Sequence, residues 1–150
     1  MPRLTERIGK SGEYSVCAWL SIHSDLVALI PHSSHTDIVF EYEDFVIRCQ
    51  VKTCTKEKKY ISRHTGRHYR SGWCWDIRKG SHTKDREYKK NQVDLYALYC
   101  KPLDLIIWIS AKDLGSKKKI TFRSSDLEKY DSFKEWMISC EQVVNSSQKA

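Results

Sequence analysis

The chain has 150 residues, of which 40% are hydrophobic and 30% are charged. This composition fits one folded domain over residues 1–150 and argues against wholesale disorder. No apolar run approaches the roughly 20 residues that cross a bilayer, and the N-terminal Met-Pro-Arg-Leu-Thr-Glu-Arg lacks the apolar region of a signal peptide. We therefore expect a cytoplasmic protein without membrane contact, whose six cysteines are free thiols.

The formal net charge of +7 is unevenly distributed. Between Lys56 and Lys90 there are twelve Lys or Arg and four Asp or Glu, a local net charge of +8, so the rest of the chain is close to neutral. A concentrated positive segment is typical of proteins that bind polyanions. A merely solvated basic loop is the alternative.

The first predicted element is an amphipathic helix over residues 5–22, with Thr5 as its N-cap. Glu13 lies beside the apolar stripe of this helix, so its carboxylate is either solvated at the edge or held inward for a purpose. The stripe consists of Ile8, Gly12, Val16, Trp19 and Leu20.

A short strand at 26–30, ended by Pro31, precedes a predicted hairpin of strands 38–42 and 45–53 that turns at Glu43-Asp44. Side chains alternate between the two faces of a strand, so Gln50 and Lys52 point the same way. In a hairpin of this length the start of one strand lies beside the end of the other. Asp37 is therefore expected across from Gln50 and Lys52, at one rim of the sheet.

Residues 54–92 form the basic segment, with turn signals at Thr65-Gly66 and Ser71-Gly72. Residues 60–63 and 67–70 are predicted to form the arms of a β-ribbon about the first turn. Such a ribbon fits the DNA major groove, where Arg binds guanine, and lysines suit phosphates. Aromatic residues among these charges would also suit RNA or single strands. The predicted DNA-binding residues are Lys56, Lys58, Lys59, Arg63, Arg67, His68, Arg70, Arg78, Lys79, Lys84 and Tyr88.

The C-terminal part predicts strands at 93–99, 105–110 and 120–123, followed by a capping box at Ser125–Glu128. Asp131 is expected to cap a helix over residues 132–144. The apolar stripe of that helix can cover its own sheet, and part of it can serve a second copy of the chain. The stripe consists of Phe133, Trp136, Met137, Cys140 and Val144. The element pattern favours the α/β class.

Four side chains suggest hydrolysis of a phosphodiester: Glu13, Asp37, Gln50 and Lys52. Mg²⁺ or Mn²⁺ would polarise the phosphate and lower the pKa of a bound water. Such hard cations prefer oxygen ligands, here Asp37, Glu13, the Val51 carbonyl and the Gln50 amide oxygen. Lys52 would orient the attacking hydroxide and stabilise negative charge in the transition state.

The run Thr36-Asp37 … Gln50-Val51-Lys52-Thr53, preceded by helical Glu13, resembles the core of the PD-(D/E)XK nuclease superfamily. The resemblance covers about residues 5–110 and is greatest to bacterial intron-encoded homing endonucleases, which use Gln at this place. Residues 88–94 are similar to a segment of resolvase-like branches. The resemblance implies a restriction-endonuclease-like core, in which a central mixed β-sheet is flanked by helices in the order helix, strand, hairpin, helix, strand. The basic ribbon or loop would be an insertion.

The resemblance also implies a site-specific endonuclease that cuts double-stranded DNA with Mg²⁺ or Mn²⁺. One such site cuts one strand, so cutting both strands favours a dimer or a dimer of dimers.

Two departures from the family pattern leave alternatives open. Thr36 stands where proline is expected, and Gln50 replaces a carboxylate, which weakens metal binding. A Holliday-junction-type resolvase and a catalytically decayed nucleic-acid-binding module therefore remain as alternatives. A zinc site is disfavoured because it would require ligands more closely spaced than those of this chain. The groups that come nearest to such a spacing are Cys49/Cys54, His32/His35 and His64/His68/Cys74.

Overall fold

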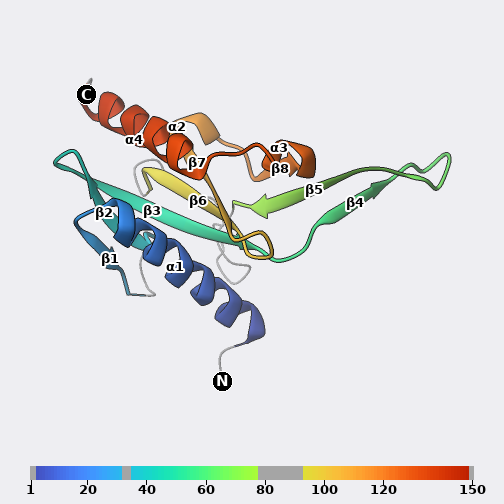
Figure 1. Ribbon diagram of the computed structural model, residues 1–150, viewed down its shortest axis with the longest axis horizontal. Coiled ribbons are helices and arrows are strands. Elements are labelled where there is room, and N and C mark those ends of the chain that lie inside the picture. The colour runs from blue at the N-terminus through green and yellow to red at the C-terminus, as the bar shows by residue number, and fades with distance from the viewer. Residues whose placement is uncertain (1–2, 32–34, 78–92, 149–150) are drawn as a thin grey trace.

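The computed structural model describes residues 3–31, 35–77 and 93–148 (Figure 1). Its main sheet has five strands in the order β1-β2-β3-β6-β7. Only β3 and β6 pair in parallel, and the other neighbours are antiparallel, so the sheet is mixed as expected. The strands are β1 (Val27–Leu29), β2 (Ile38–Tyr42), β3 (Phe45–Cys54), β6 (Leu95–Cys100) and β7 (Leu105–Ser110).

One face of this sheet is covered by α1 (Leu4–His23) and α4 (Ser132–Gln148). Their apolar sides pack on inward-facing residues of β2, β3, β6 and β7. The predicted stripe of α4 divides: three of its members are buried, whereas Phe133 and Met137 remain 46% and 40% exposed. The three buried members are Trp136, Cys140 and Val144. As predicted, Asp131 caps this helix through a hydrogen bond from the Lys134 N–H to Asp131 Oδ1 at 3.1 Å.

The other face is covered by a second sheet, β4 (Lys58–Ile61), β5 (His68–Asp76) and β8 (Lys119–Arg123). Trp73, Trp75 and Ile77 pack against the main sheet together with residues of two short helices, α2 (Ala111–Leu114) and α3 (Ser124–Leu127). Trp75 also donates a hydrogen bond to the Tyr99 carbonyl at 3.2 Å. The parallel β3–β6 pair requires a crossover. Between them the chain forms β4 and β5 of the second sheet, where the resemblance implied a helix, and then residues 78–92, which are not described.

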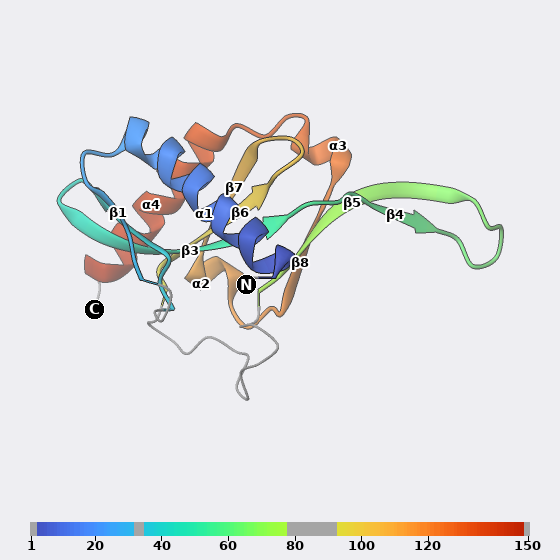
Figure 2. The ribbon, with the colours of Figure 1, turned by 90° about the horizontal axis from the view of Figure 1, so that it is seen from below.

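The free ends of β4 and β5 form a two-stranded ribbon that reaches away from the body of the molecule (Figures 1 and 2). We call residues 58–76, from the start of β4 to the end of β5, the ribbon; residues 72–76, which pair with β8, are its base. Its turn is closed by the Gly66 N–H, which donates to the Ser62 carbonyl at 2.9 Å, and Gly66 adopts a φ of 65°. The predicted ribbon about Thr65-Gly66 is therefore confirmed.

Three local predictions were wrong. Ser71-Gly72 is not a turn, because β5 continues through it and pairs with β8, a strand distant in sequence. Helix α1 begins before Thr5, at Leu4, and Glu6 accepts a hydrogen bond from the Arg3 N–H at 3.0 Å. The short helix α3 begins at Ser124, so Ser125 lies inside it and cannot be its N-cap.

Within the described residues, no helix combines the length and the apolar character that crossing a membrane requires.

Candidate active site

Asp37 lies just before β2, at the rim of the main sheet. The pairing of Ile38 with Cys49 places Asp37 opposite Gln50, the arrangement expected from the hairpin. The Asp37 N–H donates to the Cys49 carbonyl at 3.0 Å, and Asp37 Oδ2 accepts from the Val51 N–H at 2.9 Å. The Asp37 carbonyl accepts from the Ile30 N–H at 2.9 Å. Backbone bonds to two neighbouring segments thus fix the position of this carboxylate.

Glu13 reaches the same rim from α1. Its side chain is 16% exposed and hydrogen-bonded to Asp37, and Lys10 Nζ lies 3.8 Å from Glu13 Oε2. Burial raises the pKa of Asp37 to about 8, the Glu13 contact adds to the increase, and the Val51 N–H and Lys52 partly offset it. Of the two possibilities for Glu13, the structure shows the inward one. The two acids share a site where negative charge is destabilised without a cation.

Close packing of α1 against β3 brings Glu13 to this position. Gly12 faces Thr53, and a Cβ atom at Gly12 would collide with Thr53 Oγ1 and lie 3.1 Å from Thr53 Cβ. Only glycine therefore permits this approach of helix to strand. The sequence signal was a glycine within the apolar stripe of a helix, where it costs about 1 kcal/mol relative to alanine.

Gln50 and Val51 add two oxygen atoms. Gln50 is 8% exposed, and its Oε1 atom is buried with no hydrogen-bond partner among the described residues. The N–H and C=O of one strand residue point to the same edge. The Val51 carbonyl therefore points to the β2 side of β3, as the Val51 N–H does. Val51 lies beyond the last residue pair between the two strands, Ile38 with Cys49. An unpaired buried oxygen is costly unless a donor or a cation satisfies it.

Lys52 completes the group, which we call the fork: Glu13, Asp37, Gln50, Val51 and Lys52. Gln50 and Lys52 pair with Tyr96 and Leu98 of β6, so both side chains lie on the same face of β3. The Lys52 ammonium is close enough to Asp37 to lower the pKa of that carboxyl.

The fork suits a hard divalent cation. Its donors are all oxygens: two carboxylates, an amide oxygen without a partner in the described part of the chain, and the Val51 carbonyl on the β2 side of β3 beyond the last β2–β3 pair. No cluster of three or more His, Cys, Asp or Glu occurs in the described parts of the chain, so waters would complete the coordination. A cation here would relieve both the carboxylate repulsion and the unpaired Gln50 oxygen.

The predicted nucleic-acid contacts lie mostly on the ribbon. Arg63 and Arg67 are exposed in its turn, and His68 Nε2 lies 2.8 Å from Ser71 Oγ. Residues 58–75 contain no Asp or Glu to neutralise these charges. Also exposed are Lys56, Lys58, Lys59 and Arg70. Arg78, Lys79, Lys84 and Tyr88 lie outside the described residues.

Asp94 has a structural partner. It forms a salt bridge with Arg48, with Oδ1 3.1 Å from the Arg48 Nη2 atom, and Oδ2 accepts from the Arg48 N–H at 2.9 Å. The Asp94 N–H donates in return to the Arg48 carbonyl at 2.9 Å. Asp94 thus fastens the start of β6 to β3, next to the fork.

Comparison with known proteins agrees with this geometry. No curated protein sequence matches the chain. Among solved structures, a bacterial homing endonuclease, I-Ssp6803I, matches with a TM-score of 0.65 at 18% identity, covering 99% of each chain, so the two proteins share a fold. The profile of the PD-(D/E)XK endonuclease family matches residues 4–136, which include the whole fork and the ribbon. The chain therefore belongs to the PD-(D/E)XK endonuclease family.

Proposed function

We propose that the protein is a site-specific DNA endonuclease, of the homing kind, that hydrolyses phosphodiester bonds with a divalent metal. The fork carries this proposal. There the half-buried, hydrogen-bonded Asp37 and Glu13 lie beside the Gln50 amide oxygen, which has no partner among the described residues, and beside the β2-facing edge of Val51, in a chain of the PD-(D/E)XK endonuclease family. A carboxyl with a strongly raised pKa beside a lysine, as at Asp37, is typical of catalytic sites.

When bound, Mg²⁺ or Mn²⁺ would supply Lewis acidity toward the phosphate and acidify a water molecule. Asp37, Glu13, Val51 and Gln50 would hold the ion through their oxygens. Lys52 would hold the attacking water by a hydrogen bond and offset the charge that develops on the phosphoryl oxygens. The water oxygen adds to phosphorus and gives up a proton to solvent, while the bond to the leaving oxygen breaks and that oxygen takes up a proton. Hydrogen bonds to the backbone keep Asp37 in place throughout.

The ribbon would bind the duplex. Its turn arginines, Arg63 and Arg67, are exposed and suited to guanine edges in the major groove, and its lysines are suited to phosphates. Since 58–75 holds cations and no acids, affinity should depend steeply on salt. With six to ten phosphate contacts, binding would weaken by about 10³ to 10⁵ between 50 and 200 mM salt.

The test is incubation of the protein with plasmid DNA and, separately, with a four-way junction, each with and without Mg²⁺ or Mn²⁺. We expect discrete linear fragments from the plasmid, only with metal, and none with Asp37→Asn. Asp25→Asn, which alters an exposed acid before β1, is the matched control and should cut normally. Cleavage restricted to the junction would favour a resolving enzyme, and binding without cleavage would indicate a decayed site.

We also propose that the protein acts as a dimer or a dimer of dimers, since one fork cuts one strand. Apolar side chains left exposed on α4 support this: Phe133 at 46%, Met137 at 40% and Ile138 at 42%. Light scattering should give the mass of two or four chains of 17.6 kDa each. A mass of one chain at every concentration, with and without DNA, would contradict it and imply a nicking enzyme.

A further inference from the structure

The outer face of the second sheet carries a row of aligned residues at the base of the ribbon. Lys58, Gly72 and Arg123 are paired in register across β4, β5 and β8, so all three lie on one face. In β5, Trp73 and Trp75 alternate with this row and face the main sheet. The row therefore faces away from the main sheet.

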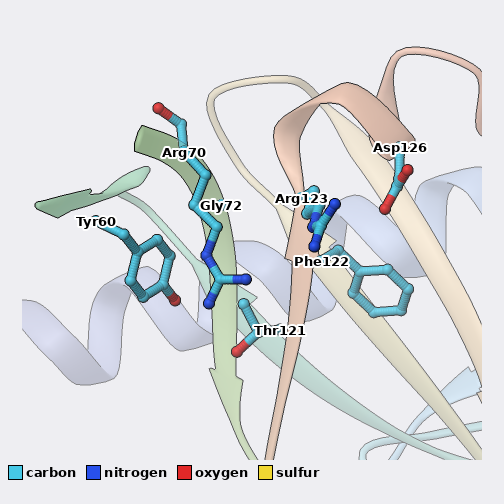
Figure 3. A pocket seen from close by; sticks show the side chains of 8 residues that line it. Tyr60, Arg70, Gly72, Thr121, Phe122, Arg123 and Asp126 are labelled. Atoms are coloured by element: carbon cyan, nitrogen blue, oxygen red, sulfur yellow. The ribbon is translucent and has the colours of Figure 1, made fainter. Parts of the chain in front are cut away.

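A hollow of about 220 Å³ lies over Gly72 (Figure 3). Gly72 is one of its lining residues, and a Cβ atom there would lie 2.9 Å from the Phe122 carbonyl oxygen and 3.4 Å from the Tyr60 ring, so these neighbours can approach only because the residue is glycine. This explains why the predicted turn glycine lies inside a strand. Besides Gly72, the lining residues are Tyr60, Arg70, Ser71, Thr121, Phe122, Arg123 and Asp126.

Two guanidinium groups dominate the charge of this hollow. Arg70 lies over the Tyr60 ring, with its guanidinium carbon 4.5 Å from the ring centroid (Figure 3). In the part of the chain that the structure describes, neither Arg70 nor Arg123 has a carboxylate within 4.0 Å. Asp126 is the one acid of the lining, so the two arginines leave a net positive charge.

We propose that the hollow binds a backbone phosphate of duplex DNA, and that Arg123, outside the basic segment, is a DNA-contacting residue. The planar guanidinium group of arginine matches phosphate oxygens in geometry and charge. A nucleobase fits less well, because Arg70 already covers the Tyr60 ring on which a base would stack. A phosphate contact at the ribbon base would set the position of the duplex without reading its sequence. This inference rests on the proposed DNA endonuclease function.

The experiment measures the affinity of metal-free protein for a labelled 30-bp duplex at several salt concentrations. We expect Arg123→Ala to bind about 3- to 10-fold more weakly, with the salt slope reduced by about 1. The affinity of Arg123→Lys should fall between those of Arg123→Ala and the wild type, because lysine keeps the positive charge but lacks the planar guanidinium group that binds two phosphate oxygens at once. Asp126→Asn should bind about 2- to 3-fold more tightly, since it removes a carboxylate that repels phosphate. The matched control is Lys119→Ala, on the same face of β8 at the Asp76 pair, which should change binding less than about 2-fold.

An Arg123→Ala protein with wild-type affinity, an equal loss in Lys119→Ala, or no gain in Asp126→Asn would overturn the phosphate site. Circular dichroism of each variant verifies that the fold is kept. If the wild-type protein binds and cuts DNA and the Arg123 and Asp126 variants bind it with wild-type affinity, the phosphate site is refuted and the proposed function is not. A wild-type protein that does not bind duplex DNA would refute both proposals, and effects seen only with an RNA duplex would assign the hollow to RNA.

Discussion

The fork and the ribbon achieve their proposed roles in opposite ways. In the fork, half-buried and buried groups lie together, and backbone hydrogen bonds tie Asp37 to Val51 at 2.9 Å and to Cys49 at 3.0 Å. On the ribbon, the cations are exposed and no acid lies among residues 58–75. Chemistry requires a few groups in fixed positions, whereas electrostatic affinity adds up over many replaceable contacts. Fork variants should therefore lose rate, and ribbon variants should lose affinity in steps.

Among the following variants, Lys52→Ala should have the largest effect on the cleavage rate, and it tests whether the fork controls rate and not affinity. Removing the ammonium that would orient water and stabilise the transition state should slow single-turnover cleavage by about 10² to 10³. Duplex affinity should change by less than about 3-fold, because one phosphate contact is a small part of the total. Quench-flow or gel-based cleavage under saturating protein measures the rate. Lys112→Ala, an exposed lysine on α2, is the control.

Gly12→Ala tests whether the fork depends on the packing of α1. The added methyl group would collide with Thr53 Oγ1 and displace Glu13 from Asp37. We expect cleavage to slow by about 10- to 100-fold, as misplacing a catalytic group can, and the metal concentration for half-maximal rate to rise.

Gly9 provides a matched control on the same helix. A Cβ atom there meets nothing within 4 Å, so Gly9→Ala should leave cleavage unchanged. In the double variant Gly12→Ala/Thr53→Ala the colliding hydroxyl is gone, and part of the rate should return. Full activity of Gly12→Ala alone would show that the position of α1 does not matter to the reaction.

Gln50 gives a smaller effect that separates metal binding from folding. Gln50→Glu restores a carboxylate to the fork and should stay active at a lower metal requirement, because a charged oxygen binds Mg²⁺ more strongly. Gln50→Ala removes the oxygen and should raise the requirement by about 10-fold, equivalent to about 1.4 kcal/mol. Metal titrations of the cleavage rate measure both. Equal titration curves for wild type and Gln50→Ala would exclude the amide from the metal site.

The smallest effect concerns stability without metal. Because folding raises the pKa of Asp37 from 3.8 to about 8, this group stabilises the fold fully below pH 3.8, and that stability is lost as the pH rises through about 8. At pH 9 the free energy of unfolding of Asp37→Asn should therefore exceed that of the wild type by at least about 1 kcal/mol. Denaturant titration measures this difference. Wild type should gain stability from Mg²⁺ at pH 9, whereas Asp37→Asn should gain less. A pH-independent difference between the two proteins would contradict the buried acid pair.

Local patterns were sufficient to predict the part of the fork that lies on the β2–β3 hairpin, whereas they left open whether Glu13 points inward or into solvent. The alternation of β3 and the length of its hairpin place Asp37 opposite Gln50, and the observed register, Ile38 with Cys49, agrees. The mixed sheet flanked by helices followed from the family resemblance and is confirmed. The predicted roles of the site residues stay predictions.

Contacts between segments distant in sequence could not be predicted. Gly72 looked like a turn residue, and its place in a strand depends on β8, which arrives about 50 residues later. Arg123 likewise joins Arg70 only through that pairing. The apolar stripe of α4 also gave no sign that Trp136 would be buried while Phe133 stays 46% exposed, since the boundary of the sheet decides it.

The most direct test of the division between fork and ribbon is a crossed pair of variants, Asp37→Asn and Arg67→Ala, each measured for duplex affinity and for single-turnover rate at saturating protein. We predict that Asp37→Asn keeps its affinity and loses cleavage by more than about 10³-fold. Arg67→Ala should lose affinity by about 3- to 10-fold and keep its rate. An Asp37→Asn protein that cuts DNA at the wild-type rate would contradict the assignment of the fork as the active site.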